Sequence, residues 1–305
     1  MKKWLLGFVL AALWAVSLFY TYGLGGLAGI HIPELVRGPA KAAMPLAALW
    51  YSGKACNEGD RTACGFKDTA GRKQVDCAEY VGGENSAVLF AFGQSNSANA
   101  GRSPYTAEGK VANFNPHDGK CYRAKDPLLG PNGSGGSVWG QVGDQLIAGG
   151  HYNRVLVVPF GIGGTNIARW VPGGDLHVRV EHTAKAMQEA GIEATHVLWH
   201  QGESDVDKTS GDAYTQMFSE LVAALRDYGI DAPVYPAVAT ICMNKGSDEL
   251  RAAQAALPNT VAGVKPGPNT DSLNKPYHRF DACHFSAQGM RSHAKLWVKA
   301  ITASG

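Results

Sequence analysis

The chain has 305 residues, of which 45% are apolar and 18% are charged, and its formal net charge is +2. This length accommodates one large domain or two small ones, each with a buried core. No run of Lys and Arg is long enough to make a nucleic-acid surface, so the composition argues against nucleic acid as a partner. A neutral ligand, held by local contacts, fits this charge balance better.

The N-terminus, residues 1–30, is predicted to be a signal-anchor or signal segment. Lys2 and Lys3 precede the apolar run Trp4–Tyr20, and no further charge occurs before Glu34. The run is just long enough to cross a bilayer and longer than the usual signal core of about 7–15 residues. This favours an uncleaved membrane anchor over a cleaved signal. The two lysines stay cytoplasmic, so we expect the rest outside the cytoplasm, periplasmic or extracellular, or secreted after cleavage.

Residues 31–85 are interpreted as a connector followed by a polar entry region that bears cysteines. The chain has an even number of cysteines without C-x-x-C spacing, which suits disulfides in an oxidising compartment. Six cysteines allow 15 pairings, and we expect one bond between two of them that lie near the ends of late strands, Cys242 and Cys283. Reduced, buried cysteines are the alternative. The six are Cys56, Cys64, Cys77, Cys121, Cys242 and Cys283.

Residues 86–305 are predicted to form one domain in which short apolar strands alternate with amphipathic helices. This alternation predicts an α/β fold, a three-layer sandwich with a central, mostly parallel sheet covered on both faces. Strands are expected at Ser86–Phe92, Arg154–Pro159, Thr195–Trp199 and Val234–Thr240. Helices are expected at Val138–Ala148, Asp175–Ala190, Asp212–Tyr228 and Asp248–Leu257, and from Ser286 to about Ala303.

The first strand leads into Gly93-Gln94-Ser95-Asn96. Gly93 permits a sharp turn, after which Ser95 stands where backbone N–H groups are free. A serine in that place can attack a carbonyl while its own N–H helps to hold the oxyanion. A serine after a strand is more often only a helix cap, so this interpretation needs catalytic partners.

Such partners occur near the C-terminus in Asp281-Ala282-Cys283-His284. Residues three apart on a turn face one another, so the carboxylate of Asp281 can accept the Nδ1–H of His284. The Nε2 atom is then left to take the proton of Ser95. An isolated D-x-x-H pair is usually a surface hydrogen bond, but this one lies just before the last helix.

Two further strands end in segments suited to an oxyanion site. The second leads into the glycine-rich Gly161–Asn166, whose backbone N–H groups can approach a ligand closely. The third leads into Trp199–Asp205, where Gln201 supplies a neutral side-chain donor. Taken separately, each segment is also compatible with an ordinary strand-to-helix loop.

Four motifs together carry a family resemblance: GQSN (93–96), GIGGTNIARW (161–170), WHQGESD (199–205) and DACH (281–284). Over residues 86–300, roughly, the chain resembles the sialate O-acetylesterase-like branch, carbohydrate esterase family 6, of the SGNH hydrolases. The resemblance implies the SGNH, flavodoxin-like fold. It also implies Ser95 as nucleophile, His284 as base and Asp281 as the residue that orients the base.

The same resemblance implies an oxyanion site and a substrate pocket. Gly163 or Gly164, together with Gln201, would join the Ser95 N–H as oxyanion donors, and Gln201 stands where the broader superfamily has Asn. Glu203 is expected to be a buried partner rather than a catalyst, and core packing is the alternative role for Trp170. The residues expected to line or brace the pocket are Gln94, Asn96, Asn166, Trp170, His200 and Glu203.

The expected reaction is removal of an O-acetyl group from a carbohydrate through an acetyl-enzyme on Ser95, without metal or organic cofactor. Acetyl transfer by the same triad and a non-catalytic carbohydrate-binding protein of the same fold are the alternatives. An α/β-hydrolase is disfavoured, because Ser97 replaces the second glycine of its G-x-S-x-G motif. The sequence specifies neither the sugar nor the oligomeric state.

Overall fold

The structure is a computed structural model that describes residues 64–303. The predicted signal or anchor segment, residues 1–30, and most of the connector lie outside the described residues. Among residues 64–303, none of the helices has the length and apolar character needed to cross a membrane.

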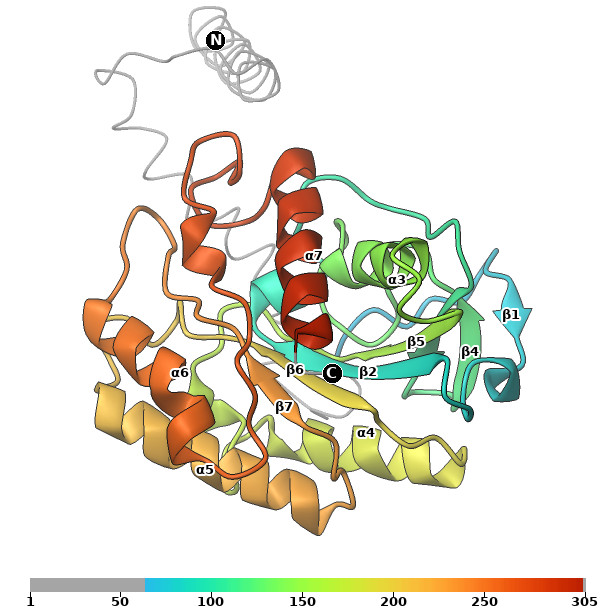
Figure 1. Ribbon diagram of the computed structural model, residues 1–305, viewed down its shortest axis with the longest axis horizontal. Helices are drawn as coiled ribbons and strands as arrows, with labels where there is room; N and C mark the ends of the chain where they lie inside the picture. Colours follow the sequence, from blue (N-terminus) through green and yellow to red (C-terminus); the bar gives the residue numbers. More distant parts are fainter. Residues whose placement is uncertain (1–63, 304–305) are drawn as a thin grey trace, which may run out of the picture. The chain divides into compact units, whose positions relative to one another are not determined.

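A sheet of seven strands forms the centre of the described region, in the order β1-β4-β3-β5-β2-β6-β7 (Figure 1). Five of them (β3, β5, β2, β6 and β7) run parallel, and β4 and β1 add antiparallel pairs at one edge. The prediction of a mostly parallel sheet is confirmed. The strands are β1 (Gln74–Val75), β2 (Ser86–Gly93), β3 (Val111–Asn115), β4 (Lys120–Arg123), β5 (Arg154–Pro159), β6 (His196–His200) and β7 (Val234–Pro236).

Five α-helices cover the two faces of this sheet, which confirms the predicted three layers. Helices α3 and α7 lie on one face, and α4, α5 and α6 lie on the other (Figure 1). Apolar residues at three- and four-residue steps make the inner face of each helix, as in α5, where Tyr214, Phe218 and Leu221 are buried. The helices are α3 (Val138–Ala148), α4 (His177–Glu189), α5 (Gly211–Asp227), α6 (Asp248–Thr260) and α7 (Ala287–Thr302).

The central strand β2 is buried along its whole length and separates two cores. Its residues alternate in size: Phe90 and Phe92 point toward the α4–α5 side, and Ala87 and Ala91 point toward the α3–α7 side. Successive side chains of a strand project to opposite faces, so this alternation places the aromatic side chains of β2 itself on one face only. The β2 strand is therefore rigidly held where it delivers the chain to Ser95.

The sequence analysis missed three strands, β1, β3 and β4, and misplaced some ends. Strands β3 and β4 are short and contain polar residues such as Asn113, whose buried side chain bonds backbone atoms, so they lack a clear apolar pattern. Strand β7 ends at Pro236 rather than Thr240. Beyond it the chain keeps only an isolated bridge, between Val238 and Asn269. Part of the predicted entry region also joins the sheet, as strand β1.

All five described cysteines are in disulfides, so the reduced alternative is wrong for them. The predicted Cys242–Cys283 bond is confirmed, and a second bond joins Cys77 to Cys121. The first bond fastens a loop after β7 to the segment that carries Asp281 and His284.

Candidate active site

Ser95 stands on a tight turn at the end of β2. Gly93 has a φ of 133°, and a Cβ atom there would lie 2.1 Å from the carbonyl oxygen of His200. Only glycine fits so close to β6, and the N–H of Gln94 then donates to that same oxygen at 2.9 Å. Ser95 begins a single 3-10 turn, Ser95–Ser97, so its own N–H has no acceptor within the turn.

Asp281 and His284 are brought together as predicted. The ring Nδ1 of His284 lies 2.6 Å from Oδ2 of Asp281, and the other carboxylate oxygen accepts the N–H groups of Cys283 and His284. Burial raises the pKa of Asp281, but these hydrogen bonds and the nearby ring outweigh it and leave the pKa below its usual value. Ala282, with a φ of 64°, makes the tight turn between the two partners.

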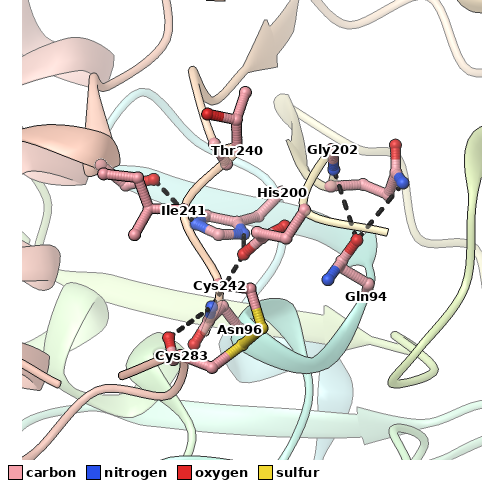
Figure 2. Close-up of polar contacts among 12 residues, drawn as sticks. Gln94, Asn96, His200, Gly202, Thr240, Ile241, Cys242 and Cys283 are labelled. Atoms are coloured by element: carbon pink, nitrogen blue, oxygen red, sulfur yellow. Dashed lines mark hydrogen bonds and ion pairs between the residues drawn. A yellow bond between two sulfur atoms is a disulfide. The ribbon is translucent and has the colours of Figure 1, made fainter. Parts of the chain in front are cut away.

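Two hydrogen bonds join the Ser95 turn to the segment that carries His284. The side-chain amide of Asn96 donates to the carbonyl of Cys283 at 3.3 Å, beside the Cys242–Cys283 disulfide (Figure 2). Further along, the N–H of Arg102 donates to the carbonyl of Phe285 at 3.1 Å. Residues nearly two hundred positions apart are therefore neighbours at the carboxyl end of strand β2.

The hydroxyl of Ser95 and the Nε2 atom of His284 are both left without a hydrogen-bond partner among the described residues, 64–303. Ser95 is 8% exposed, and the side chain of His284 is 27% exposed. Catalytic contacts are often long before substrate binds, so the free Nε2 is available both to Ser95 and to a leaving group.

The buried side chain of Glu203 supports the Ser95 turn through a hydrogen bond with Asn96. One oxygen of Glu203 accepts a hydrogen bond from the side chain of Asn96 at 2.8 Å, and the other has no partner. Because burial disfavours the charged form, the pKa of Glu203 rises to about 7. Asn96 therefore links Glu203 to the carbonyl of Cys283, and the side chains of Asn96 and Glu203 are both buried.

His200 lies in the same buried layer. Its Nδ1 atom is 3.8 Å from Glu203, beyond hydrogen-bonding distance, and its Nε2 atom is 3.1 Å from the hydroxyl of Thr270. Burial lowers the pKa of His200 to about 3, so the ring is neutral at pH 7 and makes no ion pair with Glu203. It packs against the ring of His293.

The burial of these side chains agrees with the buried partner expected at Glu203 and with a bracing role for His200. It does not agree with Gln94 or Trp170 lining the pocket, because both side chains are packed inside the fold. Gln94 turns inward, and its side-chain Oε1 atom accepts the N–H group of Gly202 (Figure 2) and that of Ser204. Trp170 is fully buried among Phe92 and other aromatic rings, so it has the core-packing role that was the alternative to lining the pocket. Of the six expected pocket residues only Asn166 is partly exposed. The five buried ones are Gln94, Asn96, Trp170, His200 and Glu203.

The prediction that the side chain of Gln201 donates to the oxyanion is also corrected. It is fully buried, and its amide nitrogen donates to Asp205 and to the carbonyl of Thr165. The amide oxygen accepts from the hydroxyl of Tyr214. The side chain is thus turned into the core beneath the loop, because Asp205 four residues later supplies a stronger, charged acceptor.

The glycine-rich loop does reach Ser95. A Cβ atom on Gly163 would lie 3.2 Å from the Cβ of Ser95, so the two residues are in direct contact. The N–H of Gly163 donates to Oδ1 of Asn132 at 2.9 Å. Gly164 is exposed, with a φ of 74°, and its N–H makes no hydrogen bond with the described residues.

Asn132 is a site residue that the sequence did not reveal. It lies on a loop between β4 and α3, is partly exposed, and is fixed by backbone bonds to Asn99 and Gly161. Its side-chain oxygen accepts from Gly163, the residue next to Ser95, and its side-chain NH2 group is left as a donor. The only sequence signal was the glycine-rich stretch around it, residues 130–136.

Metal-ligand geometry is absent from the described part of the chain: no three His, Cys, Asp or Glu side chains of residues 64–303 converge to hold an ion.

Comparison with known proteins gives a family match. Residues 85–303 match the family described as "Carbohydrate esterase, sialic acid-specific acetylesterase". A 104-residue stretch is 33% identical to "Probable carbohydrate esterase At4g34215" of Arabidopsis thaliana, and covers 33% of this chain and 40% of that protein.

Solved structures share the fold. The Arabidopsis thaliana AT4G34215 protein has a TM-score of 0.57 at 20% identity, over 72% of this chain and 99% of that one. NanS has a TM-score of 0.50 at 16% identity, over 73% of this chain and 98% of that one.

Proposed function

We propose that this chain, which belongs to the family of sialic acid-specific acetylesterases among the carbohydrate esterases, removes O-acetyl groups from a carbohydrate through an acetyl-enzyme on Ser95. Membership of this family makes the chain a carboxylic ester hydrolase. The mechanism through Ser95 and the acetylated sugar as substrate are the proposed parts. The observation that carries the mechanism is the hydrogen bond from His284 to Asp281, on a segment bonded to the Ser95 turn.

In the first half of the reaction, Ser95 Oγ attacks the acetyl carbonyl carbon while His284 Nε2 takes the hydroxyl proton. The tetrahedral intermediate collapses when the C–O bond to the sugar breaks, and His284 returns the proton to the departing sugar oxygen. Asp281 holds the ring in the tautomer that leaves Nε2 unprotonated at the start, and stabilises its charge after proton transfer.

In the second half, water takes the place of the sugar. His284 removes a proton from the water as it attacks the acetyl carbon, and the second tetrahedral intermediate releases Ser95, which recovers its proton from His284. Acetate leaves, and the enzyme is restored.

The oxyanion of both intermediates needs donors next to Ser95. We assign the N–H of Ser95, the N–H of Gly164 and the side-chain NH2 of Asn132, in place of the buried Gln201. Losing one such donor typically lowers kcat by about 100- to 1000-fold. Asn132→Asp keeps the acceptor for Gly163 but has no donor, so this variant should lose activity while its fold is unchanged. Full activity in Asn132→Asp would remove this side chain from the oxyanion site.

The esterase proposal is tested by acetate release from acetylated xylans, sialic acids and bacterial polysaccharides, with wild type and Ser95→Ala compared. We expect release from at least one substrate and a loss of at least about 1000-fold in the variant. Activity that survives in Ser95→Ala would refute the assigned nucleophile. Sugar binding without acetate release from any substrate would indicate a non-catalytic protein.

We also propose that the chain works outside the cytoplasm, tethered by its N-terminal segment. The support is its disulfides, which form in oxidising compartments, together with the apolar run near the N-terminus. Mass spectrometry of the N-terminus of the purified protein separates anchor from signal: a chain starting near residue 29 would mean cleavage.

A further inference from the structure

Most of the large apolar side chains that are exposed lie on the two segments next to His284 in the chain or joined to it by a disulfide. In the described part of the chain four large apolar side chains are more than a third exposed, and Val178 lies on α4, apart from the site. The other three belong to the two segments that the Cys242–Cys283 disulfide joins: Met243, Tyr277 and Phe280. Single exposed apolar residues are ordinary, but a group next to a reactive site indicates a binding surface.

The local backbone explains why Phe280 faces outward. Residues 277–286 form a hairpin in which Phe280 donates its N–H to the carbonyl of His284 at 3.0 Å, and Arg279 pairs with Phe285. Neighbouring positions of such a pair point to opposite sides. Phe285 is buried and Arg279 stacks on it, 4.4 Å from its centroid, so Phe280 and His284 share the outer side.

Phe280 is therefore the side chain next to the catalytic base. The two ring centroids are 6.2 Å apart, and the planes are inclined by 33°. The guanidinium carbon of Arg102, on the chain that continues from the Ser95 turn, lies 5.8 Å from the Phe280 centroid. Ala282, at the tip of the hairpin, accepts a hydrogen bond at its carbonyl from the N–H of Met243, which lies on the other segment, at 3.0 Å.

We propose that Phe280, which lies between His284 and Arg102, is a sugar subsite that packs against the C–H face of the pyranose ring carrying the acetyl ester. A pyranose ring presents a flat apolar face of C–H groups, which is complementary to an exposed aromatic ring. The inference rests on the proposed esterase function and specifies how that site takes a carbohydrate rather than a simple ester.

The subsite would act on binding and orientation, not on the bond-making steps. A ring seated on Phe280 keeps its acetyl group within reach of Ser95, because Phe280 borders His284 on the same face of the hairpin. Binding energy from the non-reacting part of the substrate then appears in kcat/KM for sugar esters only. An acetate ester without a ring gains nothing from Phe280.

The test compares two esters on the full chain: glucose penta-acetate, which has a pyranose ring, and ethyl acetate, which has none. Phe280→Ala should lower kcat/KM for the sugar ester about tenfold or more and change it less than twofold for ethyl acetate. Phe280→Trp should restore sugar-ester activity, because it restores a flat ring. Val178→Ala, which removes an exposed apolar side chain far from the site, should change neither reaction. Unchanged melting temperatures check that folding is intact.

Equal losses on both esters in Phe280→Ala, or no loss on either, would overturn the subsite. A wild type that hydrolyses neither ester, nor any acetylated polysaccharide, would instead defeat the esterase proposal. In that event calorimetry with acetylated xylo-oligosaccharides on the Ser95→Ala protein, with and without Phe280→Ala, still decides the subsite. Binding that is at least tenfold weaker without the ring supports it, and equal binding refutes it.

Discussion

The two halves of the site are held in place by different forces. The Ser95 turn ends the central strand of the sheet, and backbone bonds fix it on both sides, from Gln94 to β6 and from Ile162 to Gly93. The hairpin 277–286 belongs to no strand of this sheet. It is held by the Cys242–Cys283 bond, by Asn96, and by Arg279, whose guanidinium donates to four backbone carbonyls.

This difference predicts that the proposed nucleophile and the proposed base respond to different kinds of substitution. The proposed nucleophile is positioned mainly by backbone bonds to the sheet, with support from Glu203 through Asn96, so changes that disturb the sheet should move it most. The proposed acid–base pair lies outside the sheet. Its segment is held by side chains and a disulfide, and by backbone bonds from Arg102 and Met243, so single changes remote from the sheet should weaken catalysis and leave the fold intact.

The largest expected effect on the hairpin comes from Asp281→Asn. An amide cannot stabilise the charged ring and favours the wrong tautomer of His284, so we expect kcat to fall by about 10,000-fold with little change in the melting temperature. Steady-state kinetics on a sugar ester measure it, with Asp207→Asn as the control, because Asp207 is an exposed carboxylate paired with Lys245. A loss below tenfold would mean that Asp281 does not orient the base.

The two disulfides allow a matched comparison of hairpin and sheet. Cys242 and Cys283 are 41 residues apart, and Cys77 and Cys121 are 44 apart. Loops of this size predict similar losses of about 3–4 kcal/mol in unfolding free energy when either pair becomes serine. Only the Cys242→Ser, Cys283→Ser protein should also lose kcat, by about tenfold, since its bond lies next to His284. Urea unfolding measures the loss of stability, and kinetics at urea concentrations below the unfolding transition measure kcat. Equal kcat in the two double variants would contradict the claim that the Cys242–Cys283 bond positions His284.

Glu203 gives a pH-dependent prediction. Its pKa is raised from 4.5 to about 7 in the folded chain, so the folded state keeps a proton that the unfolded chain has lost. The stability that this proton provides is complete below pH 4.5 and disappears as the pH rises through 7, about 3 kcal/mol in all. Glu203→Gln cannot ionise and should therefore gain stability relative to wild type between pH 5 and pH 8.

Urea unfolding of both proteins at several pH values measures that gain. Asp126, whose pKa burial also raises to about 7, is present in both proteins, so its contribution cancels. A stability difference that stays constant from pH 5 to pH 8 would show that Glu203 is already ionised in the folded chain.

The smallest expected effect is at the tip of the hairpin. Ala282 has a positive φ, which a side chain disfavours, so Ala282→Gly should raise the unfolding free energy by at most about 1 kcal/mol and leave kcat within twofold. Ala300→Gly in α7 should have the opposite sign, because glycine weakens a helix interior by about 1 kcal/mol. A destabilised Ala282→Gly protein would mean that the turn carries no strain.

The sheet-held half of the molecule was the more predictable one. Strand β5 and helix α3 have the predicted ends, because each is an unbroken apolar or amphipathic run. The position of Ser95 after a strand and the bond between Asp281 and His284 were also predictable, since they depend on a strand end and on a short turn. The direction of side chains was not: Gln201 turns inward because of Asp205 and Tyr214, and Asn132 reaches the site from a loop without a motif. Such directions depend on contacts between distant segments.

The most direct test of the central claim is to trap the nucleophile. The full-length protein is treated with a fluorophosphonate, which phosphonylates activated serines, and its peptides are mapped by mass spectrometry. We predict one adduct, on Ser95, that is absent in Ser95→Ala and strongly reduced in His284→Ala. An adduct on another serine, or labelling of Ser95 that does not change without His284, would contradict the account.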